Sequence, residues 1–199
     1  MLSCENIKFY YDKSTTILND ISLQLEPNKI VGLVGPSGYG KSTLAQILAG
    51  YLNPISGEVI YNDKRINDYK MCPVQLIYQH PEKAIDPLWK MEKVISEGVK
   101  ISERVIKGLE IKDIWMTRYP NELSGGELQR FNIARALSEG TQYIIADEIT
   151  TMLDPITQSN LWHFVLNECK SRNIGMLVVT HNMHLADKIC DYVIDVTKL

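Results

Sequence analysis

The residues at positions 35–43 have the types and the spacing that hold the phosphate chain of a nucleotide. Glycines let the backbone curl so that successive N–H groups point inward and, with a helix N-terminus, surround phosphate oxygens. We expect Lys41 to reach the β and γ phosphates and Ser42 to offer its hydroxyl to Mg²⁺. The alternative is a glycine-rich turn with a solvated lysine. The P-loop pattern G-x-x-x-x-G-K-S/T is filled by Gly35, Pro36, Ser37, Gly38, Tyr39, Gly40, Lys41, Ser42 and Thr43.

Two carboxylates, Asp147 and Glu148, follow an apolar run over 143–146. Burial of such a strand delivers both acids to its carboxyl end, where ligands of open α/β sheets bind. Asp147 is then placed to hold Mg²⁺ through its water shell, and Glu148 to polarise the water that attacks the γ phosphate. An acidic turn after a strand is common by itself. The P-loop in the same chain favours the chemical interpretation.

The segment 123–127 reads Leu-Ser-Gly-Gly-Glu and starts a helix. Ser124 and Glu127 have the spacing of a capping box, which is the structural interpretation. Gly125 and Gly126 leave the helix N-terminus bare of side chains, so a phosphate could dock there as well. With the P-loop, this gives two phosphate-binding helix ends about 85 residues apart, which suggests one nucleotide held between two surfaces.

The elements that position these residues follow the alternation of strands and helices typical of α/β proteins. A strand over 30–34 leads into the P-loop, and the helix after it ends at Gly50. The turn at Asp12–Ser14 could join the first two strands as a hairpin. Further strands are expected over 7–11, 21–25, 57–61, 74–78, 143–146, 176–180 and 192–196.

Between His80 and Asn121 the pattern changes to short helices interrupted by three prolines, which predicts a helical insert. The α/β pattern resumes at Tyr143. A helix beginning at Pro155 places four apolar side chains on one face. They are Leu161, Phe164, Val165 and Cys169.

Composition narrows the function classes. The chain has 199 residues, a formal net charge of −3, 45% hydrophobic and 23% charged residues, as expected for one soluble globular domain. It lacks the basic excess that non-specific nucleic-acid binding requires. Its apolar runs are far shorter than the roughly 20 residues of a membrane-spanning helix. The four cysteines have neither disulfide-framework nor zinc spacing.

The order of these motifs resembles that of the ATP-binding subunit of an ABC transporter. Leu-Ser-Gly-Gly-Glu at 123–127 matches the signature motif that separates this family from other P-loop proteins. The family includes an aromatic residue that stacks on adenine, and Tyr11 sits at its place, although Tyr10 competes for that role. The resemblance covers essentially the whole chain. The sequence departs from the family pattern at Ile149, where proline is usual, and at Tyr39, where a small residue is common.

The resemblance also implies roles for three polar residues. Gln79 matches the Q-loop glutamine, implied to act in catalysis and at Mg²⁺ together with Ser42 and Asp147. His181 matches the switch histidine and joins Gln79 and Glu148 in the implied catalytic set. It could instead only cap the next helix.

Met152-Leu153-Asp154 resembles the D-loop, which contributes to the nucleotide site. Asp154 before Pro155 is also an excellent helix N-cap, and it could serve only that role.

The implied fold is a P-loop NTPase (RecA-like) α/β core with an N-terminal antiparallel β part and an inserted helical subdomain. The core is expected over 1–79 and 139–199, and the helical subdomain, with the signature motif, over 80–138. The chain stops at Leu199, soon after the strand 192–196, so control through a C-terminal domain is not expected.

The implied mechanism joins two ATPase subunits head to tail around two ATP molecules and their Mg²⁺ ions. The implied partners are a second ATPase subunit, two membrane permeases and an extracytoplasmic substrate-binding protein, with no nucleic acid. This would place the chain peripherally at the cytoplasmic face of the membrane. The stretches 79–87 and 148–158 resemble importers of peptides, nickel and metal chelates. The alternative, a soluble ABC ATPase acting on nucleic acid or ribosomes, usually needs a coiled-coil insert or a second cassette, and 79–123 leaves no room for either.

Overall fold

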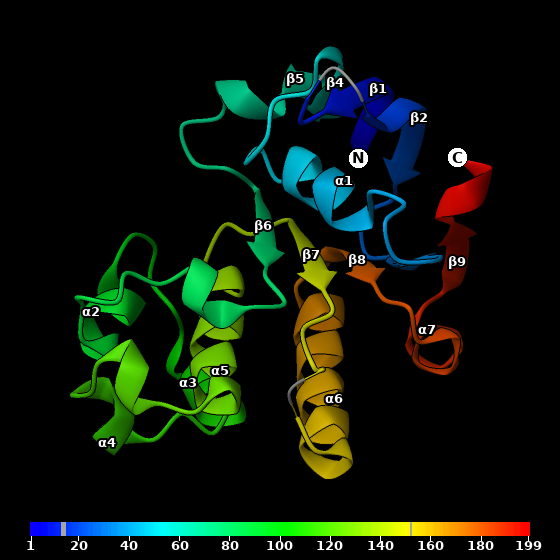
Figure 1. The fold of residues 1–199 in the computed structure, drawn as a ribbon. Coiled ribbons are helices and arrows are strands. Elements are labelled where there is room, and N and C mark those ends of the chain that lie inside the picture. Colours follow the sequence, from blue (N-terminus) through cyan, green and yellow to red (C-terminus); the bar gives the residue numbers. More distant parts are fainter. Residues whose placement is uncertain (13–14, 152) are drawn as a thin grey trace. The chain divides into compact units, whose positions relative to one another are not determined.

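The computed structural model describes residues 1–12, 15–151 and 153–199. The chain forms two compact units (Figure 1). The first unit comprises Met1–Leu76, Gln142–Glu148 and Asn173–Leu199, and the second comprises Ile77–Thr141 and Ile149–Arg172. The turn expected at 12–14 and Met152 of the D-loop fall at least partly outside the described residues.

The first unit opens with an antiparallel sheet in the strand order β2-β1-β4-β5. In β2, Ile21, Leu23 and Leu25 are buried while the residues between them are exposed, the alternation of a strand with one face on the core. This is the predicted N-terminal antiparallel part. The strands are β1 (Leu2–Tyr10), β2 (Thr16–Leu25), β4 (Ser56–Tyr61) and β5 (Lys64–Arg65).

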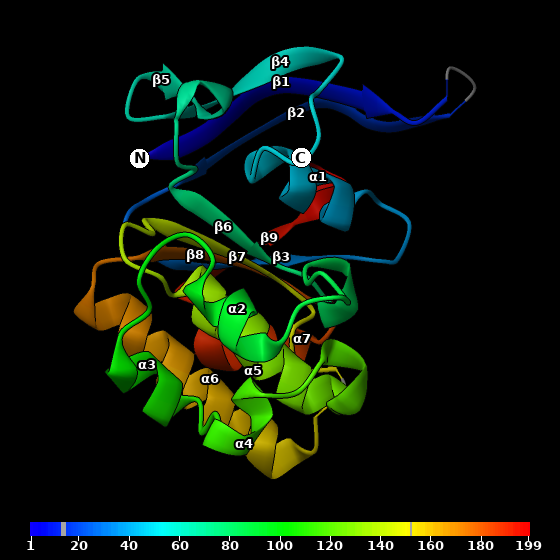
Figure 2. The ribbon, with the colours of Figure 1, turned by 90° about the vertical axis from the view of Figure 1, so that its left-hand side faces the viewer.

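A parallel sheet of order β6-β7-β8-β3-β9 forms the rest of the core. Every residue of β3, β7 and β8 is buried, because helices or the other sheet cover both faces. Helix α1 (Lys41–Leu48) lies between the two sheets, and α7 (Met183–Ile189) covers the opposite face of the parallel sheet (Figures 1 and 2). The strands are β3 (Ile30–Val34), β6 (Val74–Ile77), β7 (Tyr143–Asp147), β8 (Gly175–Val179) and β9 (Tyr192–Asp195).

The second unit is helical. Its core is formed by one face of α5 around Phe131, whose ring centroid lies 6.5 Å from that of Trp115. Arg172, just after α6, donates to the carbonyl oxygens of Leu137 and Ser138 at 2.6 and 2.7 Å and so fixes the end of α6 beside the end of α5. The helices are α2 (Met91–Ser96), α3 (Glu103–Gly108), α4 (Asp113–Met116), α5 (Gly125–Ala136) and α6 (Pro155–Ser171).

Four short 3₁₀ helices complete the elements of the described part of the chain: η1 (Ile66–Asp68), η2 (Pro81–Lys83), η3 (Pro120–Glu122) and η4 (Val196–Lys198). The predicted fold class is confirmed, with its antiparallel part, its parallel core and its helical insert. Helix α6 was expected within the core range 139–199, whereas it groups with the helical unit here. Within the described residues, no helix combines the length and apolar character needed to cross a bilayer.

Candidate nucleotide site

The P-loop follows β3 and curls back before α1. Gly35 and Gly40 have φ angles of 140° and 78°, in the region that side chains rarely allow. A Cβ on Gly40 would lie 2.7 Å from Leu18 Cδ2, and one on Gly35 would lie 2.6 Å from Val196 Cγ1. Both glycines are therefore required by backbone conformation and by close packing against neighbouring side chains.

Lys41 is the first residue of α1, and its side chain is folded back over the loop. Only 7% of the residue is exposed, and its Nζ donates to the carbonyl oxygens of Gly35 and Pro36, both at 2.8 Å. An ammonium group has three donors, so two fix its position and the third can meet a phosphate oxygen. The first turn of α1 carries no acidic residue. The buried ammonium group of Lys41 and a helix N-terminus without acidic side chains thus favour binding of an anion at this loop.

Asp147 and Glu148 lie where the sequence predicted, at the carboxyl end of β7. Asp147 is buried and pairs in register with Val179 of β8. Glu148 has a φ of 49°, and its backbone N–H donates to the Val179 carbonyl at 3.0 Å. The left-handed backbone turns the chain sharply at the end of the sheet. Strain of this kind is often found at functional sites.

His181 contacts Glu148 directly. The Nδ1 of His181 lies 2.6 Å from Oε1 of Glu148, a hydrogen bond in which the carboxylate accepts. The Glu148 side chain is 18% exposed and that of His181 is 61% exposed. The helix-cap alternative for His181 is wrong, because Asn182 caps α7 by accepting from the Leu185 N–H at 3.1 Å.

The sheet order brings these residues to one edge. Strand β8 lies between β3 and β7 and runs parallel to both, so the loops after all three strands leave the sheet at its carboxyl edge. Strands in a sheet are about 4.8 Å apart, which separates the end of β3 from the end of β7 by roughly 10 Å. That distance fits a phosphate group with its metal ion between the P-loop and Asp147.

Tyr11 is the better placed of the two candidate stacking residues. It is 65% exposed, while Tyr10 is half-buried at the end of β1. The Tyr11 hydroxyl lies 3.4 Å from Oγ1 of Thr43, and its ring meets Phe9 edge-on at a centroid distance of 4.9 Å. The ring of Tyr11 is thus tied near the start of α1 while remaining accessible to a planar ligand.

The signature residues begin α5 in the second unit. The capping box is confirmed: Ser124 Oγ accepts from the Glu127 N–H at 3.3 Å, and Glu127 Oε2 accepts from the Ser124 N–H at 2.8 Å. The latter bond holds the pKa of the Glu127 carboxyl below its usual value. Ser124 and Gly125 are exposed, so this helix end is accessible.

Asp154 and Gln79 also belong to the second unit. Asp154 caps α6 by accepting from the N–H groups of Ile156 and Thr157 at 3.1 and 3.0 Å, and hydrogen bonds from Thr157 hold its pKa below the usual value. The capping role is confirmed, and a D-loop role stays a prediction. Gln79 is half-buried, two residues beyond β6. Its catalytic role also stays a prediction.

Sequence reasoning missed two sets of contacts. The bond between Glu148 and His181 joins residues 33 apart, and only the adjacency of β7 and β8 brings them together. Polar residues on α5 at intervals of three contact the segment after β6. The signal in the sequence is three polar side chains repeating on one side of a helix, namely Gln129, Asn132 and Arg135.

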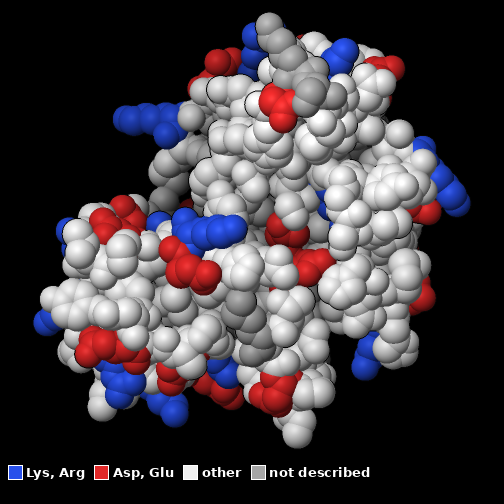
Figure 3. Space-filling view, in the orientation of Figure 1, with Lys and Arg blue, Asp and Glu red and all other residues white. Residues whose placement is uncertain are grey.

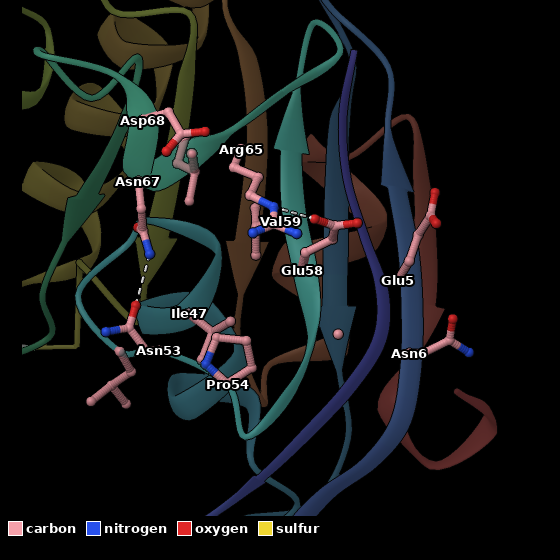
Figure 4. Close-up of a pocket in the computed structure, with 13 residues that line it drawn as sticks. Glu5, Asn6, Ile47, Asn53, Pro54, Glu58, Val59, Arg65, Asn67 and Asp68 are labelled. Carbon is pink, nitrogen blue, oxygen red and sulfur yellow. Dashed lines mark hydrogen bonds and ion pairs between the residues drawn. The ribbon is translucent and has the colours of Figure 1, made fainter.

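A cavity of about 520 Å³ lies elsewhere in the first unit, beside the antiparallel sheet (Figure 4). Its lining includes Glu5, Glu58 and Asp68, and the one basic residue among the described residues that line it, Arg65, is paired with Glu58 at 2.6 Å. This acidic lining disfavours nucleotide phosphates. On the face drawn in Figure 3, the described Lys and Arg side chains stand among Asp and Glu side chains rather than in one basic patch.

We expect His181→Ala to lower ATP turnover by about ten- to a hundredfold while ATP affinity changes little, because the Glu148 carboxylate loses its orienting partner. Steady-state turnover and equilibrium ATP binding measure the two effects. His184→Ala is the matched control, an exposed histidine of α7 that should retain the parent rate. Equal turnover in the two variants would contradict the role given to His181.

Comparison with known proteins gives concordant results. The ABC transporter family model matches residues 18–151. The nickel import system ATP-binding protein NikE of Staphylococcus aureus (strain bovine RF122 / ET3-1) is 30% identical over 211 residues, which cover 98% of this chain and 85% of that protein. The NikE protein of strain N315 gives the same identity and coverage.

Two solved structures show the same fold. The dimeric ATP-binding cassette MJ0796, in a post-hydrolysis state bound to ADP and Pi, has a TM-score of 0.83 at 24% identity and covers 98% of this chain and 94% of its own. An ATP binding subunit of an ABC transporter has a TM-score of 0.84 at 22% identity. The match covers 98% of this chain and 85% of the chain of that subunit.

Proposed function

Because this chain belongs to the ABC transporter family as an ATP-binding subunit, we propose that it powers import across a membrane by closing on ATP together with a second ATPase subunit. The chain is an ATPase of the ABC type. The observation that carries the proposal is the carboxyl edge of the parallel sheet, where Lys41, Asp147 and the Glu148–His181 pair follow three neighbouring strands.

Each residue of this edge has a separate task in ATP hydrolysis. The P-loop N–H groups and Lys41 hold the phosphates, and Tyr11 stacks on the adenine. Glu148 orients the attacking water and accepts its proton as the water oxygen bonds to the γ phosphorus and the bond to ADP breaks. His181 fixes the Glu148 carboxylate through the 2.6 Å hydrogen bond.

The residues present suit Mg²⁺. Ser42 and Asp147 supply hydroxyl and carboxylate oxygens, the hard ligands that this ion prefers. Within the described residues, no three His, Cys, Asp or Glu side chains gather as a metal cage. That agrees with an ion bound by one or two side chains and by substrate phosphates. When bound, Mg²⁺ neutralises charge on the phosphates.

The second half of each ATP site comes from the partner subunit. Ser124 and Gly125 are exposed at the N-terminus of α5, where N–H groups can meet the γ phosphate of an ATP held by another subunit. Gln79 is assigned, with Asp147, Glu148 and His181, to the half that serves this chain's own ATP. Asp154 contributes to the nucleotide site through the D-loop. The dimeric state of MJ0796, a structure of the same fold, supports this arrangement.

Nickel, a metal chelate or a peptide is the cargo that we propose. The support is the resemblance of 79–87 and 148–158 to such importers and the nickel import systems named for the relatives. Two membrane permeases and an extracytoplasmic binding protein complete the proposed complex, with this chain at the cytoplasmic face of the membrane.

We expect the isolated chain to bind Mg-ATP but to turn it over at least about tenfold more slowly than with its partner, because each isolated subunit holds half a site. Turnover should be measured over a range of protein concentrations, with and without the partner ATPase. Fast turnover in a sample that stays monomeric would refute the composite site.

Accumulation of nickel by cells tests whether nickel is the transported cargo. Cells lacking the chain should lose high-affinity uptake of radioactive nickel, and the parent gene should restore it while Lys41→Ala should not. Uptake of a labelled dipeptide by the same cells separates peptide import from metal import. Unchanged uptake of free nickel, chelated nickel and dipeptide would count against the proposed transport function.

A further inference from the structure

Side chains on one stripe of α5 donate hydrogen bonds to backbone carbonyls of the segment 78–84, which begins just after β6. We call the three donors Gln129, Asn132 and Arg135 the α5 stripe. The bonds join Gln129 Nε2 to the oxygen of Tyr78 at 3.1 Å, Asn132 Nδ2 to that of Pro81 at 3.5 Å and Arg135 Nη1 to that of Ala84 at 2.6 Å.

The spacing of donors and acceptors is matched. Donors recur every three residues on α5, and residues three apart on an α-helix share a face. Acceptors also recur every three residues, in a segment that contains the 3₁₀ helix η2 (Pro81–Lys83). Pro81 is the first residue of η2 and Ala84 is its C-cap, so these two acceptors are one 3₁₀ turn apart, whereas Tyr78 lies before the helix. Because donors and acceptors have the same spacing, the three hydrogen bonds hold the segment 78–84 at its start, its middle and its end.

Burial makes two of these contacts insensitive to water. Gln129 and Asn132 are 3% and 6% exposed. Arg135 is steadied from the other side, because its Nη2 lies 3.2 Å from Oε2 of Glu97. The contact of Asn132 is at the long limit of a hydrogen bond and is the weakest of the three.

Gln129 has a buried side-chain oxygen that is unpaired within the described part of the chain, a feature that a contribution to folding stability alone does not explain. Its Nε2 donates to Tyr78, but its buried Oε1 has no hydrogen-bond partner among the described residues. An unpaired buried amide oxygen is unfavourable, and a leucine of similar volume would fill the space without it. The contribution of Gln129 is thus the position it gives to the Tyr78 carbonyl, next to Gln79.

We propose that the α5 stripe is a set of positioning residues that makes the 78–84 segment, including Gln79, move as one body with α5 and its signature N-terminus. Ser124 lies only five residues before Gln129 on the same helix. This inference rests on the proposed function. A displacement of the signature serine by a partner's ATP is then transmitted to Gln79 by side chain–carbonyl bonds rather than along the chain.

The first test is amide hydrogen exchange in the full-length chain. Gln129→Leu should speed exchange of peptides spanning 78–84 by about five- to tenfold, the effect of losing one hydrogen bond from a local opening equilibrium. The melting temperature should change by no more than about 2 °C, because the leucine also removes the unpaired oxygen. Unchanged exchange at 78–84 would overturn the proposal, whether or not the chain hydrolyses ATP.

A matched pair of arginines sharpens the test. Arg135 and Arg130 both donate Nη1 to a backbone carbonyl at 2.6 Å and both pair with a glutamate, but Arg130 holds Leu109 instead of the 78–84 segment. Arg135→Met should speed exchange at 78–84, Arg135→Lys should restore part of the protection, and Arg130→Met should leave that segment as in the parent. Equal effects of the two methionine variants would overturn the proposal.

The second test is kinetic and uses the chain with its partner ATPase. Gln129→Leu and Arg135→Met should lower kcat by about tenfold with KM for ATP within about twofold, because Gln79 acts after ATP is bound. A rise in KM with an unchanged kcat would overturn the positioning role. Absence of turnover in the parent would instead refute the proposed function, and the exchange experiment would still decide whether the stripe holds the segment.

Discussion

Glu148→Gln is expected to slow ATP hydrolysis by roughly a hundred- to ten-thousandfold while leaving ATP binding intact. Glutamine keeps the size of the side chain and can still hydrogen-bond to His181, but it cannot accept the proton of the attacking water. Because Glu148 also sits at a φ of 49° at the end of β7, a substitution of the same shape avoids disturbing the turn. Single-turnover hydrolysis and equilibrium binding of Mg-ATP measure the two quantities.

Blocked hydrolysis should also trap the closed dimer. With the partner ATPase present, Glu148→Gln should show an ATP-dependent shift to earlier elution in size exclusion, which the parent shows only transiently. Glu5→Gln, an exposed glutamate of β1 in the same unit, serves as the control and should behave like the parent. Hydrolysis by Glu148→Gln at the parent rate would show that another group, Gln79 or His181, positions the water.

The two neighbouring carboxylates, Asp147 and Glu148, are expected to have different roles. Asp147→Asn should weaken Mg²⁺ binding and with it much of the ATP affinity, whereas Glu148→Gln should not. The burial of Asp147 and the partial exposure of Glu148 fit this division, since a metal ligand is held by the strand and a base must meet water.

Much of the fold could be predicted because buried parallel strands are continuous apolar runs. The strand expected over 30–34 has those bounds, and that over 143–146 extends by one residue to Asp147. The first strand was expected to begin at residue 7 but begins at Leu2. Asn6 has a φ of 50° and the pairing shifts register between Cys4 and Ile7, so the alternation that marks a strand is broken there.

The helical unit was harder to resolve from the sequence. Helices α2, α3 and α4 have six, six and four residues, which is too short for a period of 3.6 to be seen. Proline and capping signals predicted that helices exist there without giving their bounds. The site shows the same limit, since its loops were predicted from motifs while the contact between Glu148 and His181 depends on strand order.

Lys41 and Ser124 are expected to act on different ATP molecules, Lys41 on the ATP of this chain and Ser124 on the ATP of a partner. Lys41→Ala should weaken Mg-ATP binding by at least about a hundredfold, because it removes a charge-assisted contact to the phosphates and the bonds that fix Gly35 and Pro36. Lys29→Ala, an exposed lysine just before β3, is the control and should bind like the parent. Isothermal titration of the isolated chain measures both affinities.

Ser124→Arg should give the opposite result, with ATP affinity unchanged in the isolated chain and partner-dependent turnover lost. The arginine is expected to project from the exposed N-terminus of α5 into the place where, in the proposed composite site, the partner's ATP docks. It also removes a helix cap, which costs about 1 kcal/mol. Ser102→Arg removes the equivalent cap of α3, where Ser102 Oγ accepts from the Val105 N–H at 3.4 Å, and should keep turnover. If Lys41→Ala and Ser124→Arg lowered ATP affinity equally in the isolated chain, the two residues would serve the same half-site and the head-to-tail arrangement would be refuted.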